Sequence, residues 1–362
     1  MKVVLAGGGT AGHVNPAIAV ADALTGAEVT FLGTERGVES KLVAAAGYPL
    51  RTIEVRGFDR SRPWTVAATG VKAVGAILQA RRHLFSLGAD VVVGMGGYVS
   101  LPAAYAARSL KIPVVLHEQN IVLGLAHRAC RGFARRVAVS FKETLKEAGR
   151  RSIYTGNPIL GHLLQQDRAS ARAEGFDRFE LDPGRRTLLV FGGSLGARSI
   201  NRAVSGFAEM FHDRSDLQIL HVTGNSDLAL VTGSLPDEGS LIYRAVPYVE
   251  NMGHAYAVAD LAICRGGATT VAEVCALGVA CIIVPYPHHR DQQQLKHAEV
   301  LQRHGAAIVV SDSAATTDNL GRRSIGLLED AEALAKMRAA ALALGRPHAA
   351  VDLAAVIEEA SR

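Results

Sequence analysis

Glycine-rich stretches that could bind phosphate groups follow short apolar runs of the chain. The first is Gly7–His13, and Phe191–Arg198 repeats the arrangement later in the sequence. A third, Arg265–Glu273, places glycines and threonines where a helix is expected to begin. Backbone N–H groups at a helix start bind anions, and the helix dipole favours a diphosphate there. The alternative is that these glycines only form tight turns between a strand and a helix.

Three side chains in these stretches could take part in acid–base chemistry or ligand binding. His13 lies at the mouth of the first turn, where it is a candidate general base, although it could instead cap the helix. Ser194 could donate its hydroxyl to a pyrophosphate or act as an N-cap. Glu273 could accept hydrogen bonds from both hydroxyls of a ribose, but Thr270 and Glu273 also have the spacing of a capping box.

The first glycine stretch also fits the dinucleotide-binding pattern G-x-G-x-x-G through Gly7, Gly9 and Gly12. Glu35 stands 23 residues after Gly12, where such a site would have its ribose-binding acid. A nicotinamide-dependent dehydrogenase is therefore one alternative. It leaves Phe191–Arg198 unexplained, because a single dinucleotide site needs only one such loop.

The remaining candidate ligands do not indicate a metal centre. His288 and His289 are adjacent, so their side chains point in different directions, which disfavours a shared metal ion. The four cysteines form no C-x-x-C pair, which disfavours both a zinc cluster and disulfides. We therefore expect no metal and no cofactor. The glutamines Gln292–Gln294 offer neutral donors and acceptors that suit sugar hydroxyls.

Short β-branched runs alternate with glycine turns and Ala/Leu-rich stretches along the whole chain. This is the pattern of an α/β protein in which helices cover parallel sheets. Lys2–Ala6 is predicted to form the first strand. A helix should follow, with Asn15 as its N-cap and Pro16 at its first position.

The pattern occurs twice, and in each half an aspartate precedes a pair of glycines by six and seven residues. The two examples are Asp90 with Gly96 and Gly97, and Asp260 with Gly266 and Gly267. The sequence thus predicts two doubly wound, Rossmann-like domains that face a central cleft, one over residues 1–160 and one over residues 161–362. The alanine-rich helical segment 329–362 could pack back on either domain.

Length and composition exclude several classes of protein. The 362 residues suit two domains, and a net charge of +5 favours anionic partners. Only 5% of residues are aromatic, which disfavours nucleic-acid binding by base stacking. No long apolar run or signal peptide is evident, so we expect a cytoplasmic chain whose membrane contact is peripheral.

Seven strings occur in order along the chain: GGGTAGHVNP, GMGGYVS, HEQN, TGNP, FGGSLGAR, CRGGATTVAE and PYPHHRDQQQ. Read together, they resemble the lipid I N-acetylglucosaminyltransferase family of bacterial peptidoglycan synthesis. The resemblance covers essentially the whole chain and implies the GT-B fold. It also implies transfer of GlcNAc from UDP-GlcNAc to the C4 hydroxyl of MurNAc in undecaprenyl-pyrophosphoryl-MurNAc-pentapeptide (lipid I). The product is lipid II, formed with inversion at the anomeric carbon.

The same resemblance assigns roles to individual residues. His13 matches the histidine beside the family's first turn and is expected to be the catalytic base. Glu273 is expected to bind the ribose, Gln294 the sugar hydroxyls, and the backbone of Val249 the uracil edge. The expected substrate-binding residues are Thr10, Ala11, Gly12, Asn120, Ser194, Val249, Ala268, Thr269, Thr270, Glu273 and Gln294.

Two positions depart from the family's pattern. Ala11 stands where the family has a glycine, which requires an ordinary φ at this position. Leu160 stands where an arginine commonly follows TGNP. Because leucine cannot neutralise a diphosphate, either Arg198 or Arg265 takes over that role, or the donor is held more weakly.

The basic segment 56–85 is the expected contact with the anionic inner leaflet that carries the lipid acceptor. We expect Arg60, Arg62, Trp64 and Lys72 to touch the membrane at the cytoplasmic face of the cell. Four apolar residues, Val71, Val74, Leu78 and Phe85, share one face of a predicted helix. That periodicity fits an interfacial helix, and it equally fits an ordinary helix packed on a sheet.

Two further alternatives stay open beside the dehydrogenase. One is another GT-B transferase with a different lipid or small-molecule acceptor, and the other is a non-catalytic protein that binds a sugar nucleotide. The strings His117–Asn120 and Gly94–Ser100 favour the peptidoglycan branch.

Overall fold

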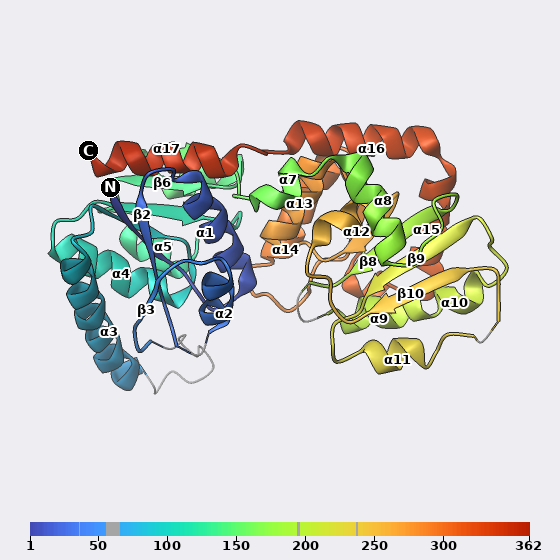
Figure 1. The fold of residues 1–362 in the computed structure, drawn as a ribbon, viewed down its shortest axis with the longest axis horizontal. Helices are drawn as coiled ribbons and strands as arrows, with labels where there is room; N and C mark the ends of the chain where they lie inside the picture. The colour runs from blue at the N-terminus through green and yellow to red at the C-terminus, as the bar shows by residue number, and fades with distance from the viewer. Residues whose placement is uncertain (36, 56–65, 194–195, 237) are drawn as a thin grey trace. The chain divides into compact units, whose positions relative to one another are not determined.

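The computed structural model describes residues 1–35, 37–55, 66–193, 196–236 and 238–362 (Figure 1). It divides the chain into two compact units. Unit 1 comprises Met1–Leu160 together with Arg346–Arg362, and unit 2 comprises Gly161–Gly345. The C-terminal helix α17 (Ala349–Ser361) therefore belongs to unit 1, although it lies within the range 161–362 expected for the second domain.

Unit 1 is built on a seven-stranded sheet in which all neighbouring strands are parallel. The strands are β1 (Lys2–Ala6), β2 (Glu28–Gly33), β3 (Leu50–Thr52), β4 (Val91–Gly94), β5 (Val114–Glu118), β6 (Arg136–Val139) and β7 (Ser152–Tyr154). Their order is β3-β2-β1-β4-β5-β6-β7, so the direction of winding reverses between β1 and β4. Ligands of doubly wound sheets bind at the carboxyl ends of the strands beside such a reversal.

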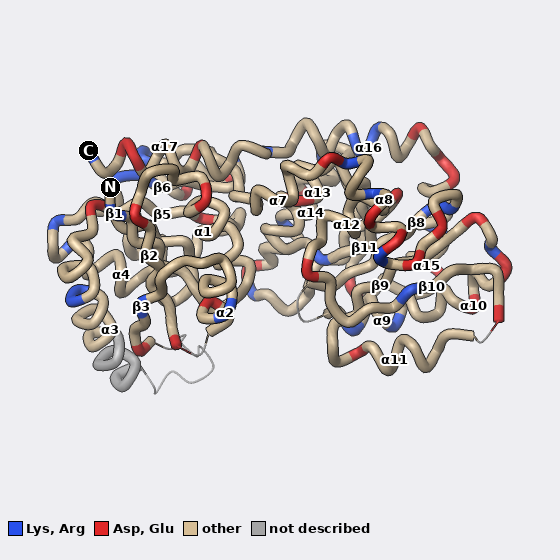
Figure 2. Tube along the Cα trace, in the orientation of Figure 1, with Lys and Arg blue, Asp and Glu red and all other residues tan. Residues whose placement is uncertain are grey.

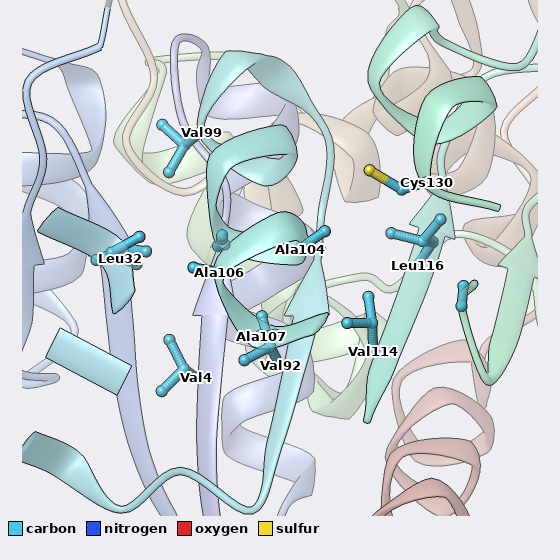
Figure 3. Close-up of a cluster of buried hydrophobic side chains, with 14 of the residues drawn as sticks. Val4, Leu32, Val92, Val99, Ala104, Ala106, Ala107, Val114, Leu116 and Cys130 are labelled. Carbon is cyan, nitrogen blue, oxygen red and sulfur yellow. The ribbon is translucent and has the colours of Figure 1, made fainter. Parts of the chain in front are cut away.

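Helices cover both faces of this sheet. They are α1 (Ala11–Ala23), α2 (Val38–Ala45), α3 (Val66–Leu87), α4 (Gly97–Ser109), α5 (Leu125–Cys130), α6 (Leu145–Ala148) and α17. Successive strand residues point to opposite faces. Val4 and Val92 accordingly lie in one core beneath α4 (Figure 3), whereas Val3 and Leu5 lie in a second core with α1 and α17. Strands buried on both faces explain the unbroken apolar runs in the sequence.

Unit 2 repeats the design with six parallel strands. They are β8 (Arg186–Phe191), β9 (Leu217–Val222), β10 (Ile242–Val246), β11 (Leu261–Cys264), β12 (Cys281–Ile283) and β13 (Ala307–Val309), in the order β10-β9-β8-β11-β12-β13. The helices are α7 (Gly161–Gln165), α8 (Arg168–Arg178), α9 (Arg198–Ser205), α10 (Phe207–Met210), α11 (Leu228–Thr232), α12 (Met252–Val258), α13 (Ala268–Leu277), α14 (Gln293–Arg303), α15 (Thr317–Glu329) and α16 (Ala331–Leu344). The predicted α/β class with two Rossmann-like parallel sheets is confirmed.

The predicted start of the first helix is wrong. Helix α1 begins at Ala11 with Thr10 as its N-cap, and Pro16 lies inside the helix rather than at its first position. An internal proline removes one backbone hydrogen bond, a cost that the buried side chains around it offset here. As a consequence, Ala11, Gly12 and His13 form the first turn of a helix and are not part of the loop before it.

The stretch Ala331–Ser361 is long and apolar enough to cross a membrane by length and composition, with a mean hydropathy of 1.3 in an 18-residue window. It consists, however, of α16 and α17, which are separated by residues 345–348 and belong to different units. Met337 of α16 packs in the core of unit 2, and Leu353 and Ile357 of α17 pack in a core of unit 1. These contacts are those of core helices.

Candidate active site

Two glycine loops of unit 1 pack directly against each other beside the winding reversal. The loop after β1 contains Gly8, and the loop after β4 leads to Gly97. A Cβ atom on Gly97 would lie 2.5 Å from the carbonyl oxygen of Gly8, and Gly97 has φ +73°. No other residue type combines this backbone conformation with such a close approach, so a glycine is needed at position 97 to build this edge.

A buried carboxylate that the sequence reasoning missed shapes the first loop. Glu39 of α2 is only 1% exposed, and its carboxylate accepts hydrogen bonds from the backbone N–H of Gly9 (3.1 Å) and from the N–H and hydroxyl of Thr34 (2.9 and 2.6 Å). Burial opposes ionisation of Glu39, but these hydrogen bonds outweigh it and lower the pKa of the carboxyl below its ordinary value. Glu35, the acid expected of a dinucleotide site, is exposed.

His13 projects from the first turn of α1 toward the end of β5. Its Nδ1 lies 2.9 Å from Oε1 of Gln119. The ring also packs against Gly96, where a Cβ atom would approach Nδ1 to 2.8 Å. Removal from water lowers the pKa of His13, against the opposing effect of the Glu118 charge. The imidazole is therefore neutral at pH 7 and able to accept a proton.

Glu118, the last residue of β5, holds the loop that contains Asn120 in place through hydrogen bonds. The carboxylate of Glu118 accepts from the backbone N–H and the side-chain amide of Asn120 (3.0 and 3.3 Å), from Gly124 N–H (2.7 Å) and from His127 Nδ1 (2.8 Å). Burial opposes its ionisation, but the nearby His127 and these hydrogen bonds hold the pKa of Glu118 at about 2. Glu118 is thus a permanent anion that orients Asn120.

The TGNP string lies at the same edge of the sheet, after β7. His117 Nε2 lies 3.1 Å from the carbonyl oxygen of Gly156, which ties this loop to β5. Asn157 is 4% exposed, and neither its amide oxygen nor its nitrogen has a hydrogen-bond partner. His117 Nδ1 and His127 Nε2 are buried without a partner as well.

In unit 2 the helix α13 starts directly after the glycine pair that follows β11. Gly267 is its N-cap, so Ala268, Thr269 and Thr270 form the first turn. The capping-box alternative is wrong, because Thr270 is already the third helical residue and makes no capping hydrogen bond. The positive end of the helix dipole faces the loop, which suits a diphosphate.

Glu273 lies one turn further along α13 and is partly buried. The hydroxyl of Tyr256 donates to its Oε2 over 2.7 Å. Tyr256 is 2% exposed and packs edge-on against Phe191 at 5.7 Å between ring centroids. Desolvation raises the pKa of Glu273 to about 7, and the Tyr256 hydrogen bond limits the rise. One carboxylate oxygen therefore has a fixed donor, and Oε1 is the atom left for a ligand.

Gln294, in the first turn of α14, lies against the same glycine pair. A Cβ atom on Gly266 would approach the backbone oxygen of Gln294 to 2.6 Å. Its side-chain oxygen accepts from Tyr286 N–H at 3.0 Å, which directs the amide group. Val249 is 5% exposed and follows β10 in the loop that Asn251 closes by capping α12.

Arg265 and Arg198, the two arginines that could replace the family's arginine at the position of Leu160, differ in exposure and in hydrogen bonding. Arg265 is 9% exposed, and its guanidinium bonds to Asp312 (2.6 Å), Ser199 and two backbone carbonyls. Arg198 has a side chain that is 76% exposed, and among the described residues it makes one long contact, with Asp227 at 3.5 Å. Arg198 can therefore reach a ligand without breaking buried contacts. Leu160 itself packs against a core of unit 1.

The structure brings most of the predicted residues together within each unit. Thr10, Ala11, Gly12, His13 and Asn120 lie at the carboxyl edge of the unit 1 sheet, and Ala268, Thr269, Thr270, Glu273 and Gln294 gather around the Gly266–Gly267 pair of unit 2. Ser194, Arg60, Arg62, Trp64 and the side chain of Lys72 lie outside the described residues. In the part of the chain that the structure describes, no three His, Cys, Asp or Glu side chains are grouped to hold a metal ion.

The two units match two halves of one protein family. Residues 3–139 match the glycosyltransferase family 28 N-terminal domain, and residues 187–353 match the glycosyltransferase family 28 C-terminal domain. The crystal structure of Acinetobacter baumannii MurG superposes with a TM-score of 0.78 at 30% sequence identity and covers 99% of both chains.

Curated relatives match over the full length. The UDP-N-acetylglucosamine--N-acetylmuramyl-(pentapeptide) pyrophosphoryl-undecaprenol N-acetylglucosamine transferase of Halothermothrix orenii is 38% identical and aligns with 100% of both chains. The transferase of the same name from Nocardioides sp. is 43% identical, covering 99% of this chain and 98% of that one. These matches overturn the dehydrogenase alternative. The chain belongs to the family of these N-acetylglucosamine transferases, within glycosyltransferase family 28.

Proposed function

We propose that the chain transfers GlcNAc from UDP-GlcNAc to the C4 hydroxyl of MurNAc in lipid I and so forms lipid II. In this proposal unit 2 binds the donor, and unit 1 supplies the base and binds the acceptor. The observation that carries the proposal is the full-length match, at 38–43% identity, to transferases whose name states this donor and acceptor. The chemistry of the described residues supports it.

The reaction is a single displacement at the anomeric carbon of GlcNAc. The acceptor O4 attacks C1 from the face opposite the phosphate, the bond from C1 to the phosphate oxygen breaks, and UDP leaves with inversion. His13 takes the proton from O4 as the new bond forms. The first turn of α13 and the glycine loop that contains Ser194 stabilise the negative charge that develops on the departing diphosphate.

Unit 2 offers a distinct group for each part of the donor. The N-terminal turn of α13, Ala268–Thr270, receives the diphosphate. Glu273 accepts from the ribose hydroxyls through Oε1, since Oε2 is engaged by Tyr256. The amide of Gln294 binds hydroxyls of the GlcNAc ring, and the backbone beside Val249 binds the uracil edge. Thr10, Ala11, Gly12 and Asn120 complete substrate binding from unit 1.

The base is tested by His13→Ala with radiolabelled UDP-GlcNAc and a lipid I analogue. We expect UDP-GlcNAc affinity to be retained and turnover to fall by about two orders of magnitude, the usual contribution of a general base. His304→Ala is the matched control, because His304 is an exposed histidine of unit 2. Near-normal turnover of His13→Ala, measured as labelled lipid product, would remove the catalytic role.

We also propose that unit 1 contacts the anionic inner-leaflet surface through α3. Ala76, Ala80 and Leu84 of α3 pack in the core, whereas Val74, Leu78 and Phe85 are 58%, 51% and 78% exposed. Val74, Leu78 and Phe85, three of the four residues of the apolar face noted in the sequence, are therefore not on the side of α3 that packs in the core. The side chain of the fourth, Val71, lies outside the described residues. Three large apolar side chains exposed on one helix suit the interfacial region of a bilayer.

A basic pocket adjoins this helix. It has a volume of about 530 Å³, and its lining includes Arg108, Lys111, Arg135, Arg136 and Arg151, from the end of α4 and the starts of β6 and β7. Figure 2 marks the lysines and arginines along the chain in blue. Arg81 of α3 donates to Ser109 Oγ at 2.6 Å, so the helix and the pocket are neighbours. Cationic groups beside an apolar ridge attract anionic headgroups while the ridge inserts.

Co-sedimentation with vesicles tests this contact. The triple variant Val74→Ser/Leu78→Ser/Phe85→Ser should lose binding to phosphatidylglycerol vesicles, whereas Leu230→Ser/Leu342→Ser, which changes leucines that are also more than half exposed, should not. Equal binding by the triple variant and the wild type would exclude α3 as the membrane contact.

A further inference from the structure

We propose that Gln119 is a positioning residue that holds His13 in the Nδ1–H tautomer, so that Nε2 is the nitrogen that receives the acceptor proton. The proposal rests on the proposed role of His13 as the base. Gln119 directly follows β5 and is 3% exposed, so its amide group is held in place by surrounding protein.

The hydrogen bonds of Gln119 determine which way its amide points. Nε2 of Gln119 lies 3.3 Å from the carbonyl oxygen of Met95, and a carbonyl oxygen can only accept. The reverse orientation would place two oxygens against each other. The amide nitrogen therefore faces Met95, and the amide oxygen faces Nδ1 of His13 at 2.9 Å.

The amide orientation in turn determines the tautomer of His13. An amide oxygen cannot donate, so Nδ1 must carry the proton. A neutral imidazole has one N–H, which leaves the lone pair on Nε2. Gly96 supports this arrangement, because any side chain there would collide with Nδ1 and push the ring away from Gln119.

Burial keeps the ring neutral until it reacts. Desolvation lowers the pKa of His13; Glu118 opposes this effect, and His127 adds to it. His117 lies close enough to interact electrostatically as well. Gln119 is neutral, so it orients the ring without adding the charge that an aspartate partner would supply. When Nε2 accepts the O4 proton, the Nδ1–H hydrogen bond to Gln119 is preserved.

Nuclear magnetic resonance on protein with ¹⁵N-labelled histidine tests the tautomer directly. Two-bond correlations between ring nitrogens and carbon-bound protons distinguish the two neutral forms, and His13→Ala identifies the His13 signals. We expect the Nδ1–H pattern in the wild type and a mixture of tautomers in Gln119→Met. Gln119→Glu keeps an acceptor and should restore the Nδ1–H form. The control is Gln302→Met, which replaces an exposed glutamine of α14.

Kinetics supply a second readout. We expect kcat of Gln119→Met to fall by about tenfold, with UDP-GlcNAc affinity unchanged. This loss is smaller than the roughly hundredfold or greater loss expected when a general base is removed, because His13 is still present. Gln119→Glu should move the acidic limb of the kcat/KM profile to higher pH, because a carboxylate stabilises the imidazolium.

An Nε2–H pattern in the wild type would overturn the proposal, even if Gln119→Met does not fold. So would an unchanged Nδ1–H pattern in Gln119→Met. An Nδ1–H pattern that depends on Gln119, combined with near-normal turnover of His13→Ala, would instead leave the tautomer assignment standing and refute the base role.

Discussion

Replacing Tyr256 by phenylalanine isolates the contribution of one buried hydrogen bond to donor binding. The Tyr256 hydroxyl donates to Glu273 at 2.7 Å and works against the desolvation that raises the pKa of Glu273 to about 7. A hydrogen bond to a charged group is worth about 1.5 kcal/mol or more, which corresponds to a pKa shift of about one unit. Tyr256→Phe should therefore raise the pKa of Glu273 to about 8.

The ribose hydroxyls are expected to bind the ionised carboxylate of Glu273, so KM for UDP-GlcNAc should depend on pH through the ionised fraction of this residue. At pH 7 that fraction falls from about one half to about one tenth, so KM for UDP-GlcNAc should rise about fivefold. At pH 9 the carboxyl is about nine-tenths ionised or more in both proteins, and the two KM values should converge. The value of kcat should change little, because Glu273 does not touch the reacting atoms.

Steady-state kinetics with a lipid I analogue at several pH values measure this directly. Tyr105→Phe is the control, because Tyr105 is 38% exposed and belongs to unit 1. A KM ratio between variant and wild type that is the same at pH 7 and pH 9, or an effect confined to kcat, would refute the assignment of Glu273 to the ribose.

Three further substitutions test the framework of the site. Glu118→Ala should destabilise unit 1 by about 3–5 kcal/mol in denaturant unfolding, because the groups that bond to this buried carboxylate are left unpaired. Since the pKa of Glu118 is held at about 2, the stabilisation that it contributes to the wild type is complete above about pH 4.5. This stabilisation is lost as the pH falls toward 2. Gly97→Ala should lower the melting temperature and turnover together, because its Cβ would lie 2.5 Å from Gly8 O; a variant of wild-type stability would contradict that packing. Arg198→Ala should weaken UDP-GlcNAc binding in titration calorimetry without loss of stability, whereas Arg265→Ala should lower the melting temperature. Unchanged UDP-GlcNAc binding by Arg198→Ala would exclude Arg198 as the residue that compensates for Leu160.

Much of the fold could be predicted because it depends on local patterns. Val3–Ala6 and Leu188–Phe191 are continuous apolar runs, and a parallel sheet covered on both faces buries such runs completely. The repeated offsets from Asp90 and Asp260 to their glycine pairs reflect the same strand, turn and helix in each unit.

Helix starts were harder to predict because several signals compete at each one. Pro16 has the fixed φ of a first helical position, yet α1 begins five residues earlier, at Ala11. Thr270 and Glu273 have capping-box spacing, but Gly267 already caps the helix and Glu273 bonds to Tyr256 instead. Local propensity is weak where tertiary contacts decide.

The supporting residues of the site could not be predicted, because their roles depend on contacts between distant parts of the chain. Gln119 meets His13 across 106 positions, and Glu39 reaches back 30 positions to Gly9. Neither has a neighbour in sequence that reveals its partner. Likewise, the alanine-rich C-terminal segment predicts a helix but not the unit that buries it.

The proposed transfer of GlcNAc from UDP-GlcNAc to lipid I is most directly tested by following the GlcNAc group itself. The wild-type chain is incubated with radiolabelled UDP-GlcNAc and a lipid I analogue, and labelled lipid and free UDP are quantified together. We predict one UDP released for each labelled lipid formed, with the new linkage of inverted anomeric configuration. Binding of UDP-GlcNAc without labelled lipid, or a product that retains the anomeric configuration of the donor, would contradict the account.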